Sequence, residues 1–122
     1  DVVVTGLDRN FIGAMIFPDL AACARHAGLP AETEAPAILA HPAVRGKFAE
    51  SLATLAQQST GSSNHVARAL LMADAPDIDK GEVTDKGSIN QRAVRTHRAA
   101  LVESLYADTP GPDIFILARK GA

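Results

Sequence analysis

Two short apolar runs with a turn between them open the sequence and most restrict its fold. Residues 2–5 and 11–17 are rich in β-prone side chains, and residues 6–10 have the composition of a turn. This pattern predicts an N-terminal β-hairpin, which Pro18 would end. Gly13, inside the second run, indicates either a β-bulge or a close approach by other backbone.

Helical signals follow the hairpin. Asp19 is a suitable N-cap for a short helix over residues 20–27, and Gly28 would end it. Residues 29–40 are rich in Pro and Ala and are expected to form a connector, with room for a helical turn. A longer helix is predicted over residues 42–58, because Pro suits a first helical turn and apolar side chains recur at helical spacing. These side chains are Val44, Phe48, Leu52 and Leu55.

A third strand and a last long helix are predicted in the second half of the sequence. A polar loop over residues 59–64 precedes the strand over residues 65–72, and a charged loop over residues 77–87 follows it. Ser88 and Gln91 form an S-x-x-Q capping box at the start of the helix. Apolar positions then line one helix face. They are Ile89, Ala93, Val94, His97, Leu101 and Leu105.

The predicted fold class is α+β, a small sheet made of the N-terminal hairpin and the third strand, packed by about three helices. Residues 108–112 would stop the last helix, and residues 113–118 form a short apolar tail that is a strand candidate. A chain of 122 residues fits a single domain with one modest core. Because Asp1 leads directly into an apolar strand, we expect this domain to be cut from a longer protein; processing would give a similar start.

Charge and composition argue against several classes of function. The net charge is −2, no dense Lys/Arg run is present and the chain has no Trp, so neither nucleic acid nor membrane is an expected partner. Cys23 is the single cysteine, which excludes an internal disulfide, and is most simply a small core residue. With no apolar run of membrane-spanning length and no secretory leader pattern, the chain is expected to be cytoplasmic. His41 and His65 have no Cys or carboxylate at ligand spacing, so no metal site is expected.

Three segments, in order, resemble the C-terminal domain of the adenylate-forming superfamily. Residues 2–17 (VVVTGLDRNFIGAMIF) are similar to the family's opening hairpin, V-V-V-G-x-x-D-x-x-x-G. Residues 69–76 are similar to its strand that ends in an acidic-x-Pro turn. Residues 84–92 (TDKGSINQR) stand where the family has T-x-x-G-K-I-x-R-R. Within the superfamily, residues 82–94 look most like the feruloyl-CoA synthase branch, and the resemblance covers most of the chain.

The resemblance implies that the chain is the C-terminal lid domain of an ATP-dependent acyl/aryl-CoA synthetase, an acid–thiol ligase. The full-length enzyme would use ATP, Mg²⁺ and coenzyme A to convert a small carboxylic acid to an acyl-adenylate and then to an acyl-CoA thioester. Most contacts to these molecules would come from a large N-terminal adenylation domain in cis, which these 122 residues do not include. The chain alone is therefore expected to bind none of the cofactors and to be inactive as a ligase.

The same resemblance implies that one lysine on the charged loop acts in adenylation. A positioned ammonium favours the approach of a carboxylate to the α-phosphate and stabilises the charge that builds on the phosphate oxygens. This role falls to Lys86, with Lys80 as the alternative. Thr84, Gly87 and Arg92 would belong to the part of the loop that faces the substrate and the nucleotide.

The loop departs from the family motif at one position that bears on this assignment. Ser88 stands where the family has the lysine after the glycine, whereas Lys86 precedes that glycine. On spacing alone, Lys86 could be a solvated loop lysine and Arg92 a plain surface arginine.

Other interpretations of the same residues remain open. A stand-alone α+β binding or regulatory module with a similar loop would have no catalytic role. A phosphopantetheine carrier would be modified on Ser88, although Gln91 favours a helix cap there. His97 is expected to be a packed histidine on the apolar stripe, and His26 to interact favourably with the dipole of its helix.

Overall fold

The computed structural model describes residues 2–6, 11–58 and 66–117, and in them a mixed sheet of four strands in the order β1-β2-β3-β4. The strands are β1 (Val2–Thr5), β2 (Ile12–Ile16), β3 (Val66–Leu71) and β4 (Phe115–Ile116). β1 and β2 pair antiparallel, β2 and β3 pair parallel, and β3 and β4 pair antiparallel. The N-terminal hairpin therefore forms one side of the sheet and places β1 at its edge.

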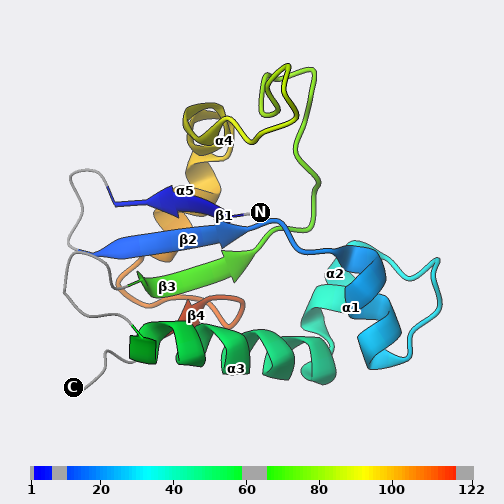
Figure 1. The fold of residues 1–122 in the computed structure, drawn as a ribbon. Helices are drawn as coiled ribbons and strands as arrows, with labels where there is room; N and C mark the ends of the chain where they lie inside the picture. Colours follow the sequence, from blue (N-terminus) through cyan, green and yellow to red (C-terminus); the bar gives the residue numbers. More distant parts are fainter. Residues whose placement is uncertain (1, 7–10, 59–65, 118–122) are drawn as a thin grey trace.

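Helices lie on both faces of this sheet (Figure 1), with α3 along one face and α4 and α5 on the other. In the described ranges they are α1 (Leu20–Ala27), α2 (Ala35–Ala40), α3 (Pro42–Gln58), α4 (Gln91–His97) and α5 (Ala99–Leu105). α1 and α2 pack against each other and against α3 at one end of the sheet.

The alternation of side chains along the strands divides the core between the two faces. Towards α4 and α5, Val3 and Met15 belong to one buried cluster, completed by Phe17, Leu70, Met72, Val94, Leu105 and Ile114. Towards α3, Ala14 and Ile16 belong to a second cluster, with Leu52, Ala69 and Phe115. Successive residues of a strand face opposite sides, so a sheet covered on both faces needs apolar residues at nearly every position of its central strands.

A third cluster joins α1, α2 and α3, and consists of Ala24, Ile38, Leu39 and Val44. Cys23 packs against it, as expected for a small residue at the edge of a core. Burial raises the pKa of the Cys23 thiol, and the negative charge of Asp19 raises it further.

The α+β class and the N-terminal hairpin predicted from the sequence are confirmed, although the described residues hold five helices rather than about three. The Asp19 side chain caps α1 by accepting from Ala22 N (3.0 Å), and Gly28 ends that helix with φ of 70°. The predicted bounds of α3 are also confirmed. The connector expected before α3, with room for a helical turn, contains α2. The polar loop over residues 59–64 and His65 lie outside the described residues.

Gly13 marks a β-bulge, the first of the two alternatives proposed for it, and the groups that approach it closely are side chains rather than backbone. The register between β2 and β3 shifts between Ile12 and Gly13, as in a bulge. A Cβ at residue 13 would lie 2.7 Å from Thr5 Oγ1 and 3.1 Å from Leu105 Cδ1. The absence of a side chain at residue 13 therefore leaves room for the side chains of Thr5 and Leu105 against β2.

The prediction of one long C-terminal helix is wrong. Arg98, with φ of −111° and ψ of 36°, interrupts it and separates α4 from α5. The two helices bury Val94 and Leu105 against the same face of the sheet. The apolar residues of the two helices are therefore spaced as they would be in one continuous helix.

The predicted Ser88–Gln91 capping box is also wrong. The N-cap of α4 is Asn90, whose side chain accepts from Ala93 N at 3.2 Å. Ser88 lies before the helix in a turn of its own, where its N–H donates to Thr84 Oγ1 at 3.2 Å. None of the helices in the described ranges is both long enough and apolar enough to cross a membrane.

Candidate functional site

The Lys86 loop, residues 83–89, is a short closed turn. Val83 and Ile89 form an antiparallel bridge at its base. Within it Thr84 N donates to Ser88 O at 2.8 Å, and Gly87 N donates to Thr84 O at 2.9 Å. Gly87 has φ of 81°, a left-handed conformation that favours glycine. In Figure 1 the yellow-green segment that contains this loop stands away from the sheet beside α4.

This turn brings together three of the residues singled out in the sequence. Lys86 is exposed, on the side of the loop opposite its base. Thr84 holds the turn through both its backbone and its hydroxyl, and Gly87 supplies the turn geometry. Arg92 lies outside the loop, exposed in the first turn of α4.

The Lys80 loop, residues 77–82, is a second closed turn directly before the first. Glu82 N donates to Asp77 O at 3.0 Å, and Gly81 N donates to Ile78 O at 3.0 Å. The Asp77 carboxylate accepts from the N–H groups of residues 79 and 80 at 2.9 and 3.3 Å. Lys80 is exposed, so the two candidate lysines lie on adjacent loops rather than at one point.

A buried ion pair between Glu82 and Arg98 lies where the two loops meet. Arg98 Nε donates to Glu82 Oε2 at 3.0 Å and Arg98 Nη2 donates to Oε1 at 2.9 Å, a two-point pairing of guanidinium and carboxylate. The side chain of Glu82 is 1% exposed and that of Arg98 is 13% exposed. Asp77 N donates a further hydrogen bond to Glu82 Oε1 at 2.8 Å.

These contacts hold the Glu82 carboxylate in its charged form. The hydrogen bonds from Arg98 are the main cause, and they lower the pKa of Glu82 below its ordinary value; burial acts in the opposite direction and is outweighed. The Asp77 N–H lowers the pKa further, as do the charges of Arg98 and His97. A carboxylate that is both buried and ionised needs this many donors.

Arg98 also connects the loops to the end of the sheet. Its Nη1 donates to Asp74 O and its Nη2 to Ala75 O, both at 2.9 Å. Its guanidinium lies over the ring of Phe17, with 4.9 Å between Cζ and the ring centroid. One side chain therefore joins the break between α4 and α5, the segment that follows β3 and the base of both loops.

A cleft of about 510 Å³ with several charged side chains in its walls opens beside this ion pair. Its walls include Lys80, His97 and Leu101, together with Asp74, Ala75, Asp77, Glu82, Arg98 and Ala100. The expectation that His97 would be packed in the core is wrong, because its side chain is 36% exposed and its Nδ1 lies 4.0 Å from Glu82 Oε2. The turn to a new helix after residue 97 places it at the mouth of the cleft rather than on the buried stripe.

Gln91 pairs with the edge of the sheet instead of capping α4. Its Oε1 accepts from Val4 N at 3.1 Å, and its Nε2 donates to Val2 O at 2.9 Å. The guanidinium of Arg95 donates to Val4 O at 3.1 Å. The side-chain amide thus takes the place of a neighbouring peptide group and covers the outward hydrogen-bonding groups of β1.

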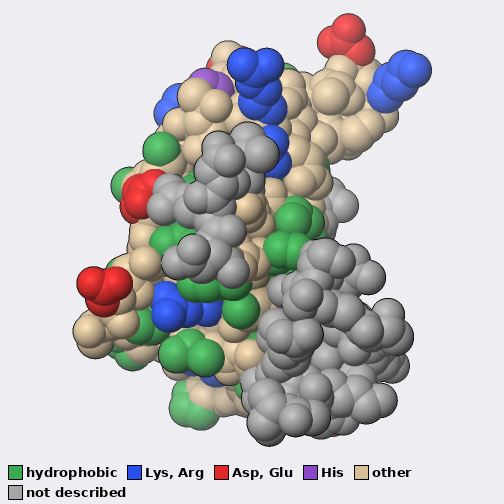
Figure 2. Space-filling view, turned by 90° about the vertical axis from the view of Figure 1, so that its left-hand side faces the viewer, with side chains coloured by type: hydrophobic (Ala, Val, Ile, Leu, Met, Phe, Trp, Pro, Cys, Tyr) green, Lys and Arg blue, Asp and Glu red, His purple; other side chains and the backbone are tan. Residues whose placement is uncertain are grey.

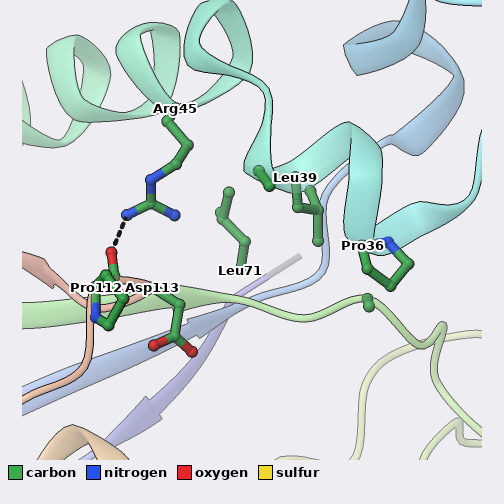
Figure 3. A pocket seen from close by; sticks show the side chains of 8 residues that line it. Pro36, Leu39, Arg45, Leu71, Pro112 and Asp113 are labelled. Carbon is green, nitrogen blue, oxygen red and sulfur yellow. Dashed lines mark hydrogen bonds between the residues drawn. The ribbon is translucent and has the colours of Figure 1, made fainter.

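A second, mostly apolar cavity of about 480 Å³ lies between α2, α3, β3 and the segment before β4 (Figure 3). Leu39, Leu71 and Pro36 line it, and Arg45 points across it from α3. Arg45 Nη2 donates to Pro112 O at 3.0 Å, and its guanidinium stacks over the ring of Phe115 at 4.2 Å from the centroid. The charge of Arg45 is thus engaged in joining α3 to the last strand.

Charged side chains are dispersed on the face of the molecule shown in Figure 2, where Lys and Arg form separate groups rather than one continuous patch. In the part of the chain that the structure describes, no three His, Cys, Asp or Glu side chains are grouped so that they could hold a metal ion.

Sequence reasoning missed Glu82 and Arg98, the two residues on which the geometry of the site depends most. Their pairing spans 16 residues and joins a loop to a helix break. The one sequence signal was an acidic residue beside the apolar Val83 in the charged loop, and this signal does not identify a partner. Comparisons with family models, with curated proteins and with solved structures find no significant match to this chain.

Proposed function

We propose that this chain is the C-terminal lid domain of an ATP-dependent acyl/aryl-CoA synthetase similar to the feruloyl-CoA synthases. In this proposal a larger adenylation domain in the same cytoplasmic protein holds ATP, Mg²⁺, coenzyme A and the carboxylic acid. The lid closes over that site and supplies a cation. The proposal is supported by the resemblance of three segments in their order, and by the geometry of the Lys86 loop.

The observation that carries the proposal is the exposed ammonium of Lys86 on a turn closed by backbone hydrogen bonds. A cation that must enter another domain's active site needs to be exposed in the free lid and held by a defined backbone. Gly87, which has no side chain, lets the backbone of the turn approach a substrate closely. Lysine delivers its charge as a compact point on a long stem, which suits a site reached from outside.

The chemistry asked of this cation is electrostatic. When a carboxylate oxygen attacks the α-phosphate of ATP, two anions approach each other and pyrophosphate leaves. The Lys86 ammonium would attract the carboxylate and offset the charge on the phosphate oxygens, without forming a covalent bond. Arg92, exposed in the first turn of α4 shortly after the loop, is a further candidate cation. Formation of the thioester would follow after the lid has moved and withdrawn the loop.

The test is Lys86→Ala in the full-length protein, with the two half-reactions measured separately. Removing one positioned charge should lower the rate of acyl-adenylate formation by about 10²–10³-fold. Thioester formation from supplied acyl-adenylate should remain close to wild type, because the loop is withdrawn in that step. Pyrophosphate exchange and thioester formation are the two measurements.

Two further variants make the test specific. Lys47→Ala removes an exposed lysine from α3 and serves as the matched control. Lys80→Ala tests the alternative cation. Equal adenylation rates in Lys86→Ala and Lys47→Ala would remove Lys86 from the mechanism. A wild-type protein that forms no acyl-adenylate from any carboxylic acid would favour the alternative of a binding or regulatory module.

A further inference from the structure

Glu82 is the common base of the two loops that carry the candidate lysines. Its N–H closes the Lys80 loop by donating to Asp77 O at 3.0 Å, and its C=O closes the Lys86 loop by accepting from Asn90 N at 2.8 Å. Its carboxylate strengthens the first closure by accepting from Asp77 N at 2.8 Å. A displacement of this one residue would therefore move both lysines.

The position of Glu82 is set by Arg98. The two-point pairing fixes the orientation of the carboxylate as well as its distance from the guanidinium. Arg98 is in turn fixed by Asp74 O and Ala75 O, in the segment that follows β3. The Arg98 guanidinium therefore connects the core to the loops, and this planar, partly buried group makes directional hydrogen bonds.

We infer that the Glu82–Arg98 pair positions the lysine loops for adenylation, and that neither side chain touches the substrate. This inference rests on the proposed function. It names the residues that would determine the position of the lysine when the lid closes. Small misplacements matter in such a site, because a shift of about 1 Å can cost about 10²-fold in rate.

Two single substitutions keep the size of each side chain and disturb the pairing. Glu82→Gln replaces one acceptor oxygen by an amide group that cannot accept from the guanidinium. Arg98→Lys keeps the positive charge but loses the planar fork, so we expect no rescue by the conservative residue. The matched controls are Glu50→Gln and Arg25→Lys, both exposed on other helices.

In the full-length protein we expect Glu82→Gln and Arg98→Lys to lower kcat of adenylation by about tenfold or more, with little change in KM for the acid. Thioester formation from supplied acyl-adenylate should stay within about twofold of the controls, since the loop does not act in that step. Hydrogen–deuterium exchange of the same proteins should show faster exchange over residues 77–90, and unchanged exchange in α3.

A double variant separates positioning from stability. Glu82→Leu with Arg98→Met replaces the ion pair by apolar side chains, which is often neutral or stabilising for a buried pair. We expect its unfolding midpoint to return close to wild type while adenylation stays low and exchange over residues 77–90 stays fast. Recovery of adenylation together with stability would overturn the inference and leave the pair a purely structural role.

The exchange measurement also keeps this inference distinct from the proposed function. If the wild-type protein forms no acyl-adenylate, the proposed function fails, and exchange over residues 77–90 still decides whether the pair holds the loops. If the wild type is active and Glu82→Gln matches Glu50→Gln in both kcat and loop exchange, the positioning role fails and the proposed function stands.

Discussion

Removal of the Arg98 guanidinium should destabilise the fold more than most single substitutions. Arg98→Met is the informative change, because methionine keeps an apolar stem beside the ring of Phe17 and removes every donor to Glu82 that Arg98 supplies. The Glu82 carboxylate, 1% exposed, would then keep, among its described contacts, the hydrogen bond from Asp77 N and the approach of His97 Nδ1 at 4.0 Å. The two carbonyls that Arg98 also serves are more accessible to water and should add little.

The size of the loss in unfolding free energy follows from leaving the buried Glu82 charge without its partner. Breaking a buried ion pair by removing one partner typically costs about 3–5 kcal/mol. The free energy of unfolding of a domain is about 5–15 kcal/mol, so this loss is a large part of the total. With a urea m-value of about 2 kcal/mol/M, the unfolding midpoint should fall by about 2 M. Urea titration followed by circular dichroism measures it on the 122-residue chain.

The double variant Glu82→Leu with Arg98→Met identifies the cause. If the loss comes from the stranded carboxylate, replacing Glu82 as well should recover most of it. An Arg98→Met protein within about 1 kcal/mol of wild type would show that the buried carboxylate does not carry the penalty expected for a charge without its partner. A double variant as unstable as the single one would show the same.

Three other outcomes are expected from the same structure. Gly13→Ala places a Cβ 2.7 Å from Thr5 Oγ1 and should cost about 1–3 kcal/mol in a thermal melt, through overpacking between β1 and β2. Asn90→Ala should lower the free energy of unfolding by about 1 kcal/mol in urea, because it removes the cap of α4. Ser88→Ala should change it by less than about 0.5 kcal/mol. A larger loss in Ser88→Ala than in Asn90→Ala would indicate that Ser88 is the cap after all. The pKa of Glu82 is lowered in the folded state. The ionised Glu82 side chain therefore stabilises the fold above about pH 4.3, and this stabilisation is lost as the pH falls through the folded pKa. Acid titration should thus destabilise wild type more than Glu82→Gln.

Local signals allowed much of the fold to be predicted from the sequence. Asp19, Gly28 and Pro42 each set a helix boundary through the geometry of their own residue, which needs no knowledge of distant contacts. Gly13 was conspicuous for a similar reason, because a glycine inside an apolar strand often marks a bulge or a close backbone approach. The helix boundaries depend on neighbours in the sequence, and the structure confirms them, as it confirms the bulge at Gly13.

Tertiary contacts decided the features that the sequence did not predict. The S-x-x-Q pattern at residues 88–91 fits a capping box, but the Gln91 amide pairs instead with β1, 87 and 89 residues away. Asn90 then becomes the N-cap, and Ser88 is left to complete the preceding turn. A hydrogen bond to the backbone of an edge strand competes with a local cap, and its formation depends on how the helix sits on the sheet.

The break at Arg98 has the same origin. One long helix and two consecutive helices that pack on the same face of a sheet have the same spacing of apolar residues, so this spacing does not predict the break. The backbone departs from helical geometry at the residue whose side chain must reach Glu82 and two carbonyls at once. The same departure brings His97 to the cleft, which is why its packing was predicted wrongly.

Electrostatics around the two loops favour Lys86 over Lys80 as the proposed adenylation cation. Lys80 lines a cleft that also holds Asp74, Asp77 and Glu82, and Arg98 matches only the last of these charges. An incoming carboxylate or phosphate would meet Asp74 and Asp77 there, neither of which Arg98 pairs with through its guanidinium, and two like charges 4 Å apart repel by about 1–4 kcal/mol near a protein surface. Lys86 lies outside that cleft on a turn that carries one carboxylate, Asp85, so an approaching anion would meet fewer negative charges there than in the cleft. The loss of adenylation should therefore be larger in Lys86→Ala than in Lys80→Ala, and the opposite ranking would move the catalytic role to the cleft beside His97.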